Sequence, residues 1–169
     1  MKIQTWKEFA KNDLTHSWAH YLMTIHELHE KQGYARLSDV ANKLKISKGS
    51  LSTSLKPLLK KKLILEDENK HLSLSKSGEE YATQIKHTDL IFQNFLTKVL
   101  NISEDKAEID ACKIEHLISP ETSTRLLQML KAIESNPKIL TELEKEMKKH
   151  SKCSLNGCKK CAKLCNCIN

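Results

Sequence analysis

Four side chains that can bind a metal ion fall within nine residues near the middle of the chain. Glu108, Cys112 and Glu115 are spaced i, i+4, i+7, and His116 follows directly. In the helix expected over residues 104–117, this spacing gathers them on one stripe. A thiol, a carboxylate and an imidazole together suit a first-row transition metal. The alternative is an ordinary helix in which Cys112 is a small buried hydrophobe.

A second group of cysteines lies at the C-terminal end. Five thiols in 15 residues have little apolar filler between them, so they do not resemble a packed core. Clustered thiolates bind zinc or iron–sulfur clusters. The short gaps are closer to cluster-binding loops than to paired zinc knuckles, so we expect an iron–sulfur cluster, with zinc or an unstructured thiol tail as alternatives. Five candidates compete for four ligand positions: Cys153, Cys158, Cys161, Cys165 and Cys167.

The elements ahead of these groups predict a winged helix-turn-helix. A helix over residues 15–31 is followed by a short helix at 38–44 with Ser38 as its N-cap, a turn at 45–49 and a second helix at 50–59. Residues 63–65 and 71–74 then form a β-hairpin with a polar tip. The second helix can enter a major groove with its N-terminal end at base edges and its lysines near phosphates. The predicted DNA-binding residues are Ser47, Lys48, Gly49, Ser50, Ser52, Thr53, Lys56, Lys60 and Lys61.

Two features of this segment depart from an ideal DNA reader. Pro57 lies inside the second helix, where we expect a kink. The hairpin tip carries Glu66, Asp67 and Glu68, which phosphate would repel. We therefore expect the wing to contribute little to binding.

Charge and composition narrow the class of protein. The 169 residues carry a net charge of +7, and residues 1–75 hold 13 basic against 8 acidic side chains, so a polyanion-binding surface is expected in the front half. No apolar run is long enough to span a bilayer, and no signal peptide opens the chain, which predicts a cytoplasmic protein without a membrane partner. Reduced thiols in that compartment favour metal or redox chemistry over a disulfide scaffold. No catalytic triad, P-loop or dinucleotide motif is visible, so no enzyme activity is expected.

The stretch Cys112-Lys113-Ile114-Glu115-His116, followed by Leu117-Ile118-Ser119, resembles the metal-site helix of the iron- and manganese-dependent repressors, the diphtheria toxin repressor and manganese transport regulator family. The similarity extends over about residues 18–130 and runs through the winged helix-turn-helix. It implies a long linking helix over residues 79–100, opened by a capping box of Ser77 and Glu80, and later helices that form a homodimer on palindromic DNA.

The resemblance also implies further ligands. His20 falls where the family carries Asp or Met, and Met23 falls where manganese-type members carry Glu. His87 matches a family ligand, although Ile91 replaces a carboxylate that often accompanies it, and Glu108 stands where iron-type members have an additional His. Imidazole and thioether in place of carboxylates shift the expected preference toward softer ions.

The prediction as a whole is a mainly α protein with three parts: a winged helix-turn-helix DNA-binding domain at 1–75, a helical metal-binding and dimerisation domain at 76–135, and a helix with the cysteine-rich tail at 136–169. The predicted function is an iron-responsive transcriptional regulator. Its expected cofactors are Fe²⁺ or Mn²⁺ in the helical domain and an iron–sulfur cluster in the tail, with zinc as the alternative there. Two alternatives are a winged-helix thiol redox sensor and an iron–sulfur or metal-handling protein that does not bind DNA.

Overall fold

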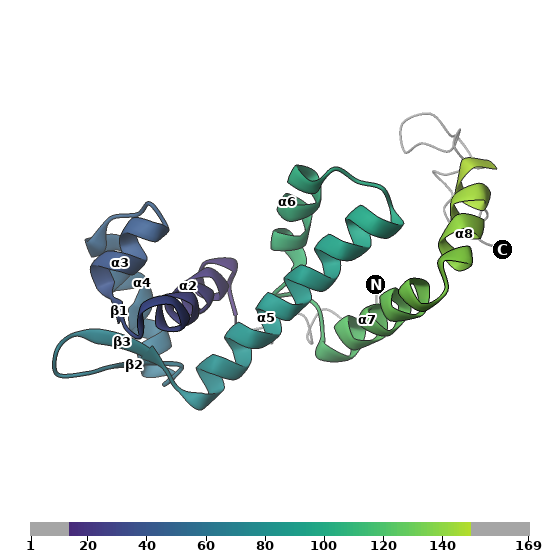
Figure 1. The fold of residues 1–169 in the computed structure, drawn as a ribbon. Coiled ribbons are helices and arrows are strands. Elements are labelled where there is room, and N and C mark those ends of the chain that lie inside the picture. The colour runs from purple at the N-terminus through teal and green to yellow at the C-terminus, as the bar shows by residue number, and fades with distance from the viewer. Residues whose placement is uncertain (1–13, 150–169) are drawn as a thin grey trace, which may run out of the picture. The chain divides into compact units, whose positions relative to one another are not determined.

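The computed structural model describes residues 14–149 and is mainly helical, as predicted (Figure 1). The chain divides into two compact units at Leu126/Leu127, within helix α7 (Pro120–Ser135). Among the residues described, no helix is both long enough and apolar enough to cross a membrane. The first unit contains every element considered below except the end of α7 and helix α8 (Pro137–Lys149).

The front of the first unit is the predicted winged helix. Helices α2 (His16–Gln32), α3 (Leu37–Lys43) and α4 (Lys48–Lys60) pack together, because each presents an apolar stripe to the other two. Leu22 and Ile25 of α2 meet Leu51, Leu55 and Leu58 of α4 in a core that excludes water almost completely. Helix α4 runs on through Pro57 to Lys60, so the proline does not end it.

A three-stranded antiparallel sheet, in the order β1-β3-β2, completes the wing. Strands β2 (Ile64–Glu66) and β3 (His71–Leu74) form the predicted hairpin, with Leu65 opposite Ser73. At its tip, Asp67 Oδ1 accepts hydrogen bonds from the backbone N–H groups of Asn69 (2.9 Å) and His71 (2.7 Å), which holds the turn. The two-residue strand β1 (Ala35–Arg36) was not predicted, because two residues show no periodicity.

Two predicted helix caps are wrong. The N-cap of α3 is Arg36 rather than Ser38, and its backbone N–H donates to Asp39 Oδ2 at 3.3 Å. Helix α5 (Lys76–Asn94) is capped by Ser75, whose hydroxyl accepts from the backbone N–H of Gly78 at 3.1 Å, and not by Ser77. In both cases the helix begins earlier than expected, because the preceding strand already fixes the backbone where the helix starts.

Helix α5 connects the winged helix to the rest of the first unit. It packs against α2 along one part of its length and against α6 (Glu104–Ile114) along another (Figure 1). Instead of reaching residue 100 as one α-helix, it passes into a π-helical turn, η1 (Phe95–Val99). Helix α6 likewise ends at Ile114, three residues before the predicted end.

Polar contacts fasten α2 to α5. The His26 Nδ1 atom lies 2.7 Å from Glu79 Oε2, and Lys86 Nζ donates to Glu30 Oε2 at 2.9 Å. Further along α5, the buried hydroxyls of Thr88 and Ser123 are 3.0 Å apart. The two contacts between α2 and α5 hold α2 beside the helix on which α6 also packs, so side chains from α2 and α6 can meet.

Candidate metal centre

Helix α2 contributes two histidines to the centre. The Thr15 hydroxyl caps the helix by accepting from the backbone N–H of Trp18 at 3.3 Å, which makes His16 its first residue. His16 and His20 are four residues apart and therefore share one face. Ala19 and Leu22 are fully buried in the winged helix, so the histidines lie on a different side of α2 from that core.

Helix α6 contributes a thiol and a carboxyl group. Ala107 and Ala111 are buried, and their small side chains let α6 approach α5 closely. Cys112 follows Ala111. Glu115 is the C-cap residue, and its backbone N–H donates to the carbonyl of Ala111 at 2.9 Å. The helix end thus fixes the backbone from which the Glu115 side chain projects.

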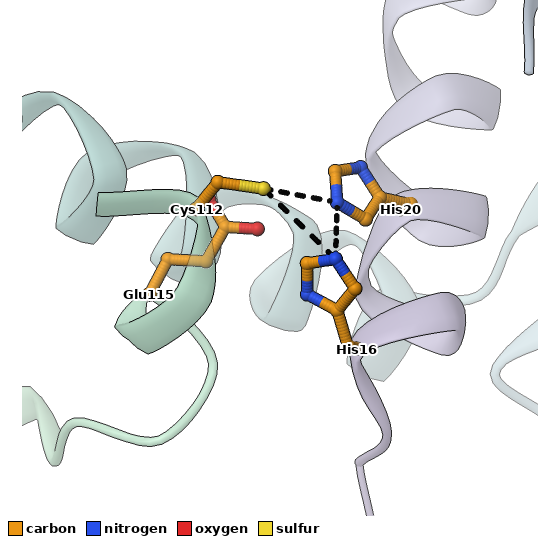
Figure 2. Close-up of side chains that lie close together, drawn as sticks. All are labelled: His16, His20, Cys112 and Glu115. Atoms are coloured by element: carbon orange, nitrogen blue, oxygen red, sulfur yellow. Dashed lines mark hydrogen bonds between the residues drawn. The ribbon is translucent and has the colours of Figure 1, made fainter. Parts of the chain in front are cut away.

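The four side chains converge between the two helices (Figure 2). The Cys112 Sγ atom lies 3.3 Å from His20 Nε2 and 4.0 Å from His16 Nε2. The two Nε2 atoms are 3.2 Å apart. One donor atom from each of the four residues, with a Glu115 oxygen as the fourth, lies within 4.8 Å of every other. Nitrogen, sulfur and oxygen donors at such separations can share one cation.

Glu115 is the most deeply buried member of the centre. Its side chain is 3% exposed, and no described group forms a hydrogen bond with its Oε1 atom. Burial, and secondarily the negative charge of Asp89, raise the pKa of Glu115 to about 8. A buried carboxyl group with an unsatisfied oxygen is costly for the fold, and a bound cation would remove that cost.

Cys112 and His20 are also held in their uncharged forms. Burial raises the pKa of the Cys112 thiol, and Glu115, Asp89 and Glu108 raise it further. Burial lowers the pKa of His20, and the neighbouring His16 lowers it as well. At neutral pH the His20 imidazole therefore offers a free lone pair, while the thiol and the carboxyl group carry protons that a cation would displace. This donor set fits a divalent transition ion.

Asp89 of α5 is a neighbour that the sequence analysis missed. Gln93 Nε2 donates to its Oδ2 at 2.8 Å, and burial raises the pKa of Asp89. Its charge acts on His20, Cys112 and Glu115. A lone carboxylate on a long helix carries no motif that would have revealed it; only the packing of α5 against both α2 and α6 does so.

The structure brings together only some of the predicted metal ligands. His20, Cys112 and Glu115 converge, and the ring of His116 lies 5.2 Å from that of His16, centroid to centroid. His87 and Glu108 are exposed and lie outside the four-residue cluster, and Met23 is half-buried in α2. His16 was not predicted as a ligand, although its position four residues before His20 was a usable signal.

The predicted DNA-binding residues extend from the N-cap of α4 to the residue just beyond its end, and all are exposed. Ser47 is the N-cap of α4, its hydroxyl accepting from the backbone N–H of Ser50 at 3.1 Å. The buried leucines of α4 fix which side of the helix faces outward. The five tail cysteines lie outside the described residues.

Comparison with known proteins matches both halves of the described region to one family. Residues 13–72 match the model for the iron dependent repressor N-terminal DNA binding domain, and residues 75–144 match the metal binding and dimerisation domain. The HTH-type transcriptional regulator MntR of Lysinibacillus sphaericus is 26% identical over 137 residues, which are 81% of this chain and 98% of the relative. The diphtheria toxin repressor of Corynebacterium diphtheriae is 26% identical over 125 residues, 74% of this chain but only 55% of the relative.

A solved structure also resembles this chain. The manganese regulator SloR superposes with a TM-score of 0.60 at 28% identity, over 67% of this chain and 53% of that one. The chain thus spans nearly all of the MntR relative and about half of the diphtheria toxin repressor and of SloR. The predicted resemblance is confirmed: this chain belongs to the iron-dependent repressor family of metal-dependent transcriptional regulators.

Proposed function

We propose that this protein is an iron-responsive repressor that binds a palindromic operator as a homodimer. The observation that carries the proposal is the convergence of His20 from α2 with Cys112 and Glu115 from α6. Helix α2 belongs to the winged helix, whereas α6 belongs to the segment that matches the metal binding and dimerisation domain. The centre therefore joins the DNA-binding part to the part through which two chains would pair.

The mechanism follows from what α2 touches. Cys112, Glu115 and the histidines of α2 would hold a divalent ion, which would supply the attraction that keeps these groups together. His20 and Cys112 would then hold α2 against α6, and α2 packs directly on α3 and α4. Fixing α2 fixes the direction of α4, which in a dimer sets the spacing of the two recognition helices. Metal binding would therefore favour one of two arrangements of the recognition helices over the other.

The donor set supports Fe²⁺ over Mn²⁺. Imidazole and thiolate donors bind later first-row ions more tightly, while Mn²⁺ prefers carboxylate, carbonyl and water oxygens. Only one of the four clustered residues is a carboxylate. The names of the relatives include both manganese and iron regulators, so the proposal rests on the donors of this chain.

The raised pKa of Cys112 argues against the thiol redox sensor. A reactive sensor cysteine has a lowered pKa and an accessible thiolate. Here burial and three carboxyl groups favour the thiol form of Cys112. For the tail, the spacing of its cysteines supports an iron–sulfur cluster, with zinc as the alternative.

The test is DNA binding by anaerobic protein with and without Fe²⁺. We expect Fe²⁺ to change operator affinity at least about tenfold, a coupling of about 1.4 kcal/mol. Cys112→Ser should remove the response, whereas Cys153→Ser in the tail should retain it. A response that needs an oxidant but no metal would favour the redox sensor, and no DNA binding at all would favour a metal-handling protein.

A further inference from the structure

We propose that His16 is a protein ligand of this centre, and that with His20, Cys112 and Glu115 it forms a closed four-donor site that favours tetrahedral ions and discriminates against Mn²⁺. The inference rests on the proposed metal centre and specifies its ligands and selectivity. His16 has no counterpart in the metal-binding pattern identified from the sequence.

The backbone of α2 already places His16 for this role. It is the first residue of the helix, held by the Thr15 cap, and lies one turn before His20. The two imidazole rings meet edge to face, with centroids 4.4 Å apart and an interplanar angle of 82°. Their Nε2 atoms point at the same space, which also contains the Cys112 sulfur (Figure 2).

The separations of the donor atoms match a small tetrahedral site. Bonds of about 2.0–2.1 Å to nitrogen and 2.3 Å to sulfur place two nitrogens about 3.3 Å apart and a nitrogen and a sulfur about 3.6 Å apart. The two Nε2 atoms here are 3.2 Å apart, and the sulfur is 3.3 and 4.0 Å from them. Both sulfur–nitrogen distances lie within about 0.4 Å of the tetrahedral value.

Glu115 gives a second, independent indication of a ligand. Its side chain is 3% exposed, and Oε1 accepts no hydrogen bond from the described residues. Figure 2 shows the carboxyl group on the same side of α6 as the Cys112 sulfur, facing the α2 histidines. Buried carboxyl oxygens are normally satisfied by donors or by a cation. The groups nearest to it in the cluster are a thiol and two imidazoles. These are metal-binding groups, and none of them forms a hydrogen bond with Oε1, so the arrangement points to a bound cation as the partner of this oxygen.

The donor count determines the selectivity. Two imidazoles, one thiolate and one carboxylate fill four positions, and zinc sites with four protein ligands are almost always tetrahedral. Mn²⁺ has the weakest affinity in the first-row series and favours octahedral oxygen donors. Replacing one imidazole by solvent would open a position for water and would reduce the penalty against Mn²⁺.

The experiment uses the full chain with all five tail cysteines changed to serine, so that only the body centre binds metal. Co²⁺ serves as the spectroscopic probe and Zn²⁺ and Mn²⁺ as competitors. We expect intense visible bands of tetrahedral Co²⁺ with a thiolate-to-metal band. His16→Asn should reduce the visible intensity several-fold and weaken Zn²⁺ binding about 10- to 100-fold, with Mn²⁺ affinity changed less than about threefold.

Matched variants separate the possible outcomes. His26→Asn removes another α2 histidine, one that lies beside Glu79 and outside the cluster, and should leave the Co²⁺ spectrum unchanged. His16→Cys should restore tetrahedral bands and strengthen the thiolate band, a gain that misfolding cannot produce. A wild-type spectrum and Zn²⁺ affinity in His16→Asn, with both lost in Cys112→Ser, would overturn the inference but leave the centre intact. Unchanged Co²⁺ binding in Cys112→Ser would instead overturn the proposed centre itself.

Discussion

The Cys112 sulfur lies 3.3 Å from the Nε2 atom of His20, although 92 positions separate the two residues. This contact joins α6 directly to α2, and α5 packs against both helices. The burial that lets the two atoms meet also raises the pKa of the thiol and lowers the pKa of the imidazole. The same packing therefore brings the donor atoms together and keeps the Cys112 thiol and the His20 imidazole in their neutral forms.

The first prediction concerns proton release. Near pH 7 the Cys112 thiol and the Glu115 carboxyl group are protonated, because burial raises the pKa of Cys112 above its ordinary value and that of Glu115 to about 8. Binding of Co²⁺ by the tail-serine protein should release about two protons per ion, since metal ligands must be deprotonated. Calorimetry in buffers of different ionisation enthalpy measures this number. Cys112→Ser should reduce it to about one; an unchanged count would mean that the sulfur is not a ligand.

The second prediction concerns pH and stability of the metal-free protein. The pKa of Glu115 rises from 4.5 to about 8 on folding. Above pH 4.5 the unfolded state loses its proton while the folded state keeps it, so Glu115 contributes stability that is full below pH 4.5 and is lost as pH rises to about 8. Glu115→Gln stays uncharged, and we expect it to be more stable than the parent at pH 8 by roughly 1–3 kcal/mol, with little difference at pH 4.5.

Denaturant unfolding with chelator at both pH values checks this result. Both Glu115→Gln and its parent contain His20 and His116, so the difference in stability between the two proteins reports on Glu115 alone. Their pKa values are lowered, so they make both proteins less stable as pH falls below 6.5. Equal stability differences at pH 4.5 and 8 would contradict the assigned pKa.

Sequence patterns predicted what depends on periodicity and motif. The apolar stripes of α2 and α4, the β2–β3 hairpin and the Cys112–His116 segment each repeat or match over many positions. Sequence patterns did not predict features that depend on one packing contact between distant segments. The two-residue strand β1 forms only because β3 lies beside it, and Asp89 acts on the centre only because α5 packs against both α2 and α6. His16 was missed for the same reason, since a histidine at a helix start is usually solvated.

The third prediction tests the junction between the wing and α5. A Cβ atom on Gly78 would lie 2.1 Å from the backbone oxygen of Leu63, which also accepts the Ser75 N–H at 3.0 Å. Gly78→Ala must shift backbone and should destabilise the protein by about 2–3 kcal/mol. Gly49→Ala in α4 is the matched control, because its Cβ would meet nothing within 4 Å; it should be neutral or stabilising by up to about 1 kcal/mol. Thermal unfolding measures both, and equal effects would refute the close approach.

The fourth prediction concerns the cysteine tail. Protein prepared without oxygen should be brown if Cys153, Cys158, Cys161 and Cys165 hold an iron–sulfur cluster, with Cys167 in reserve. Truncation before Cys153 should remove the colour and leave Co²⁺ binding at Cys112 intact. Metal analysis and an optical spectrum decide the outcome. A colourless anaerobic preparation with one equivalent of tail-bound zinc would end the cluster hypothesis.

The last prediction concerns the DNA-binding surface. Lys56 and Lys60 are exposed on α4, on a helix whose buried leucines fix the side that faces outward. Their double replacement by alanine should weaken binding to all duplexes alike, because phosphate contacts carry no sequence information. The slope of log affinity against log salt should become shallower by about two for each bound chain. Lys106→Ala with Lys148→Ala removes the same charge from α6 and α8 and should leave the slope unchanged.

In contrast, Thr53→Ala should keep the slope but reduce the preference for operator over random DNA, as expected for a residue at a base edge. Fluorescence anisotropy over a range of salt concentrations separates these effects, and a common loss of slope in both lysine pairs would show that net charge rather than α4 determines binding.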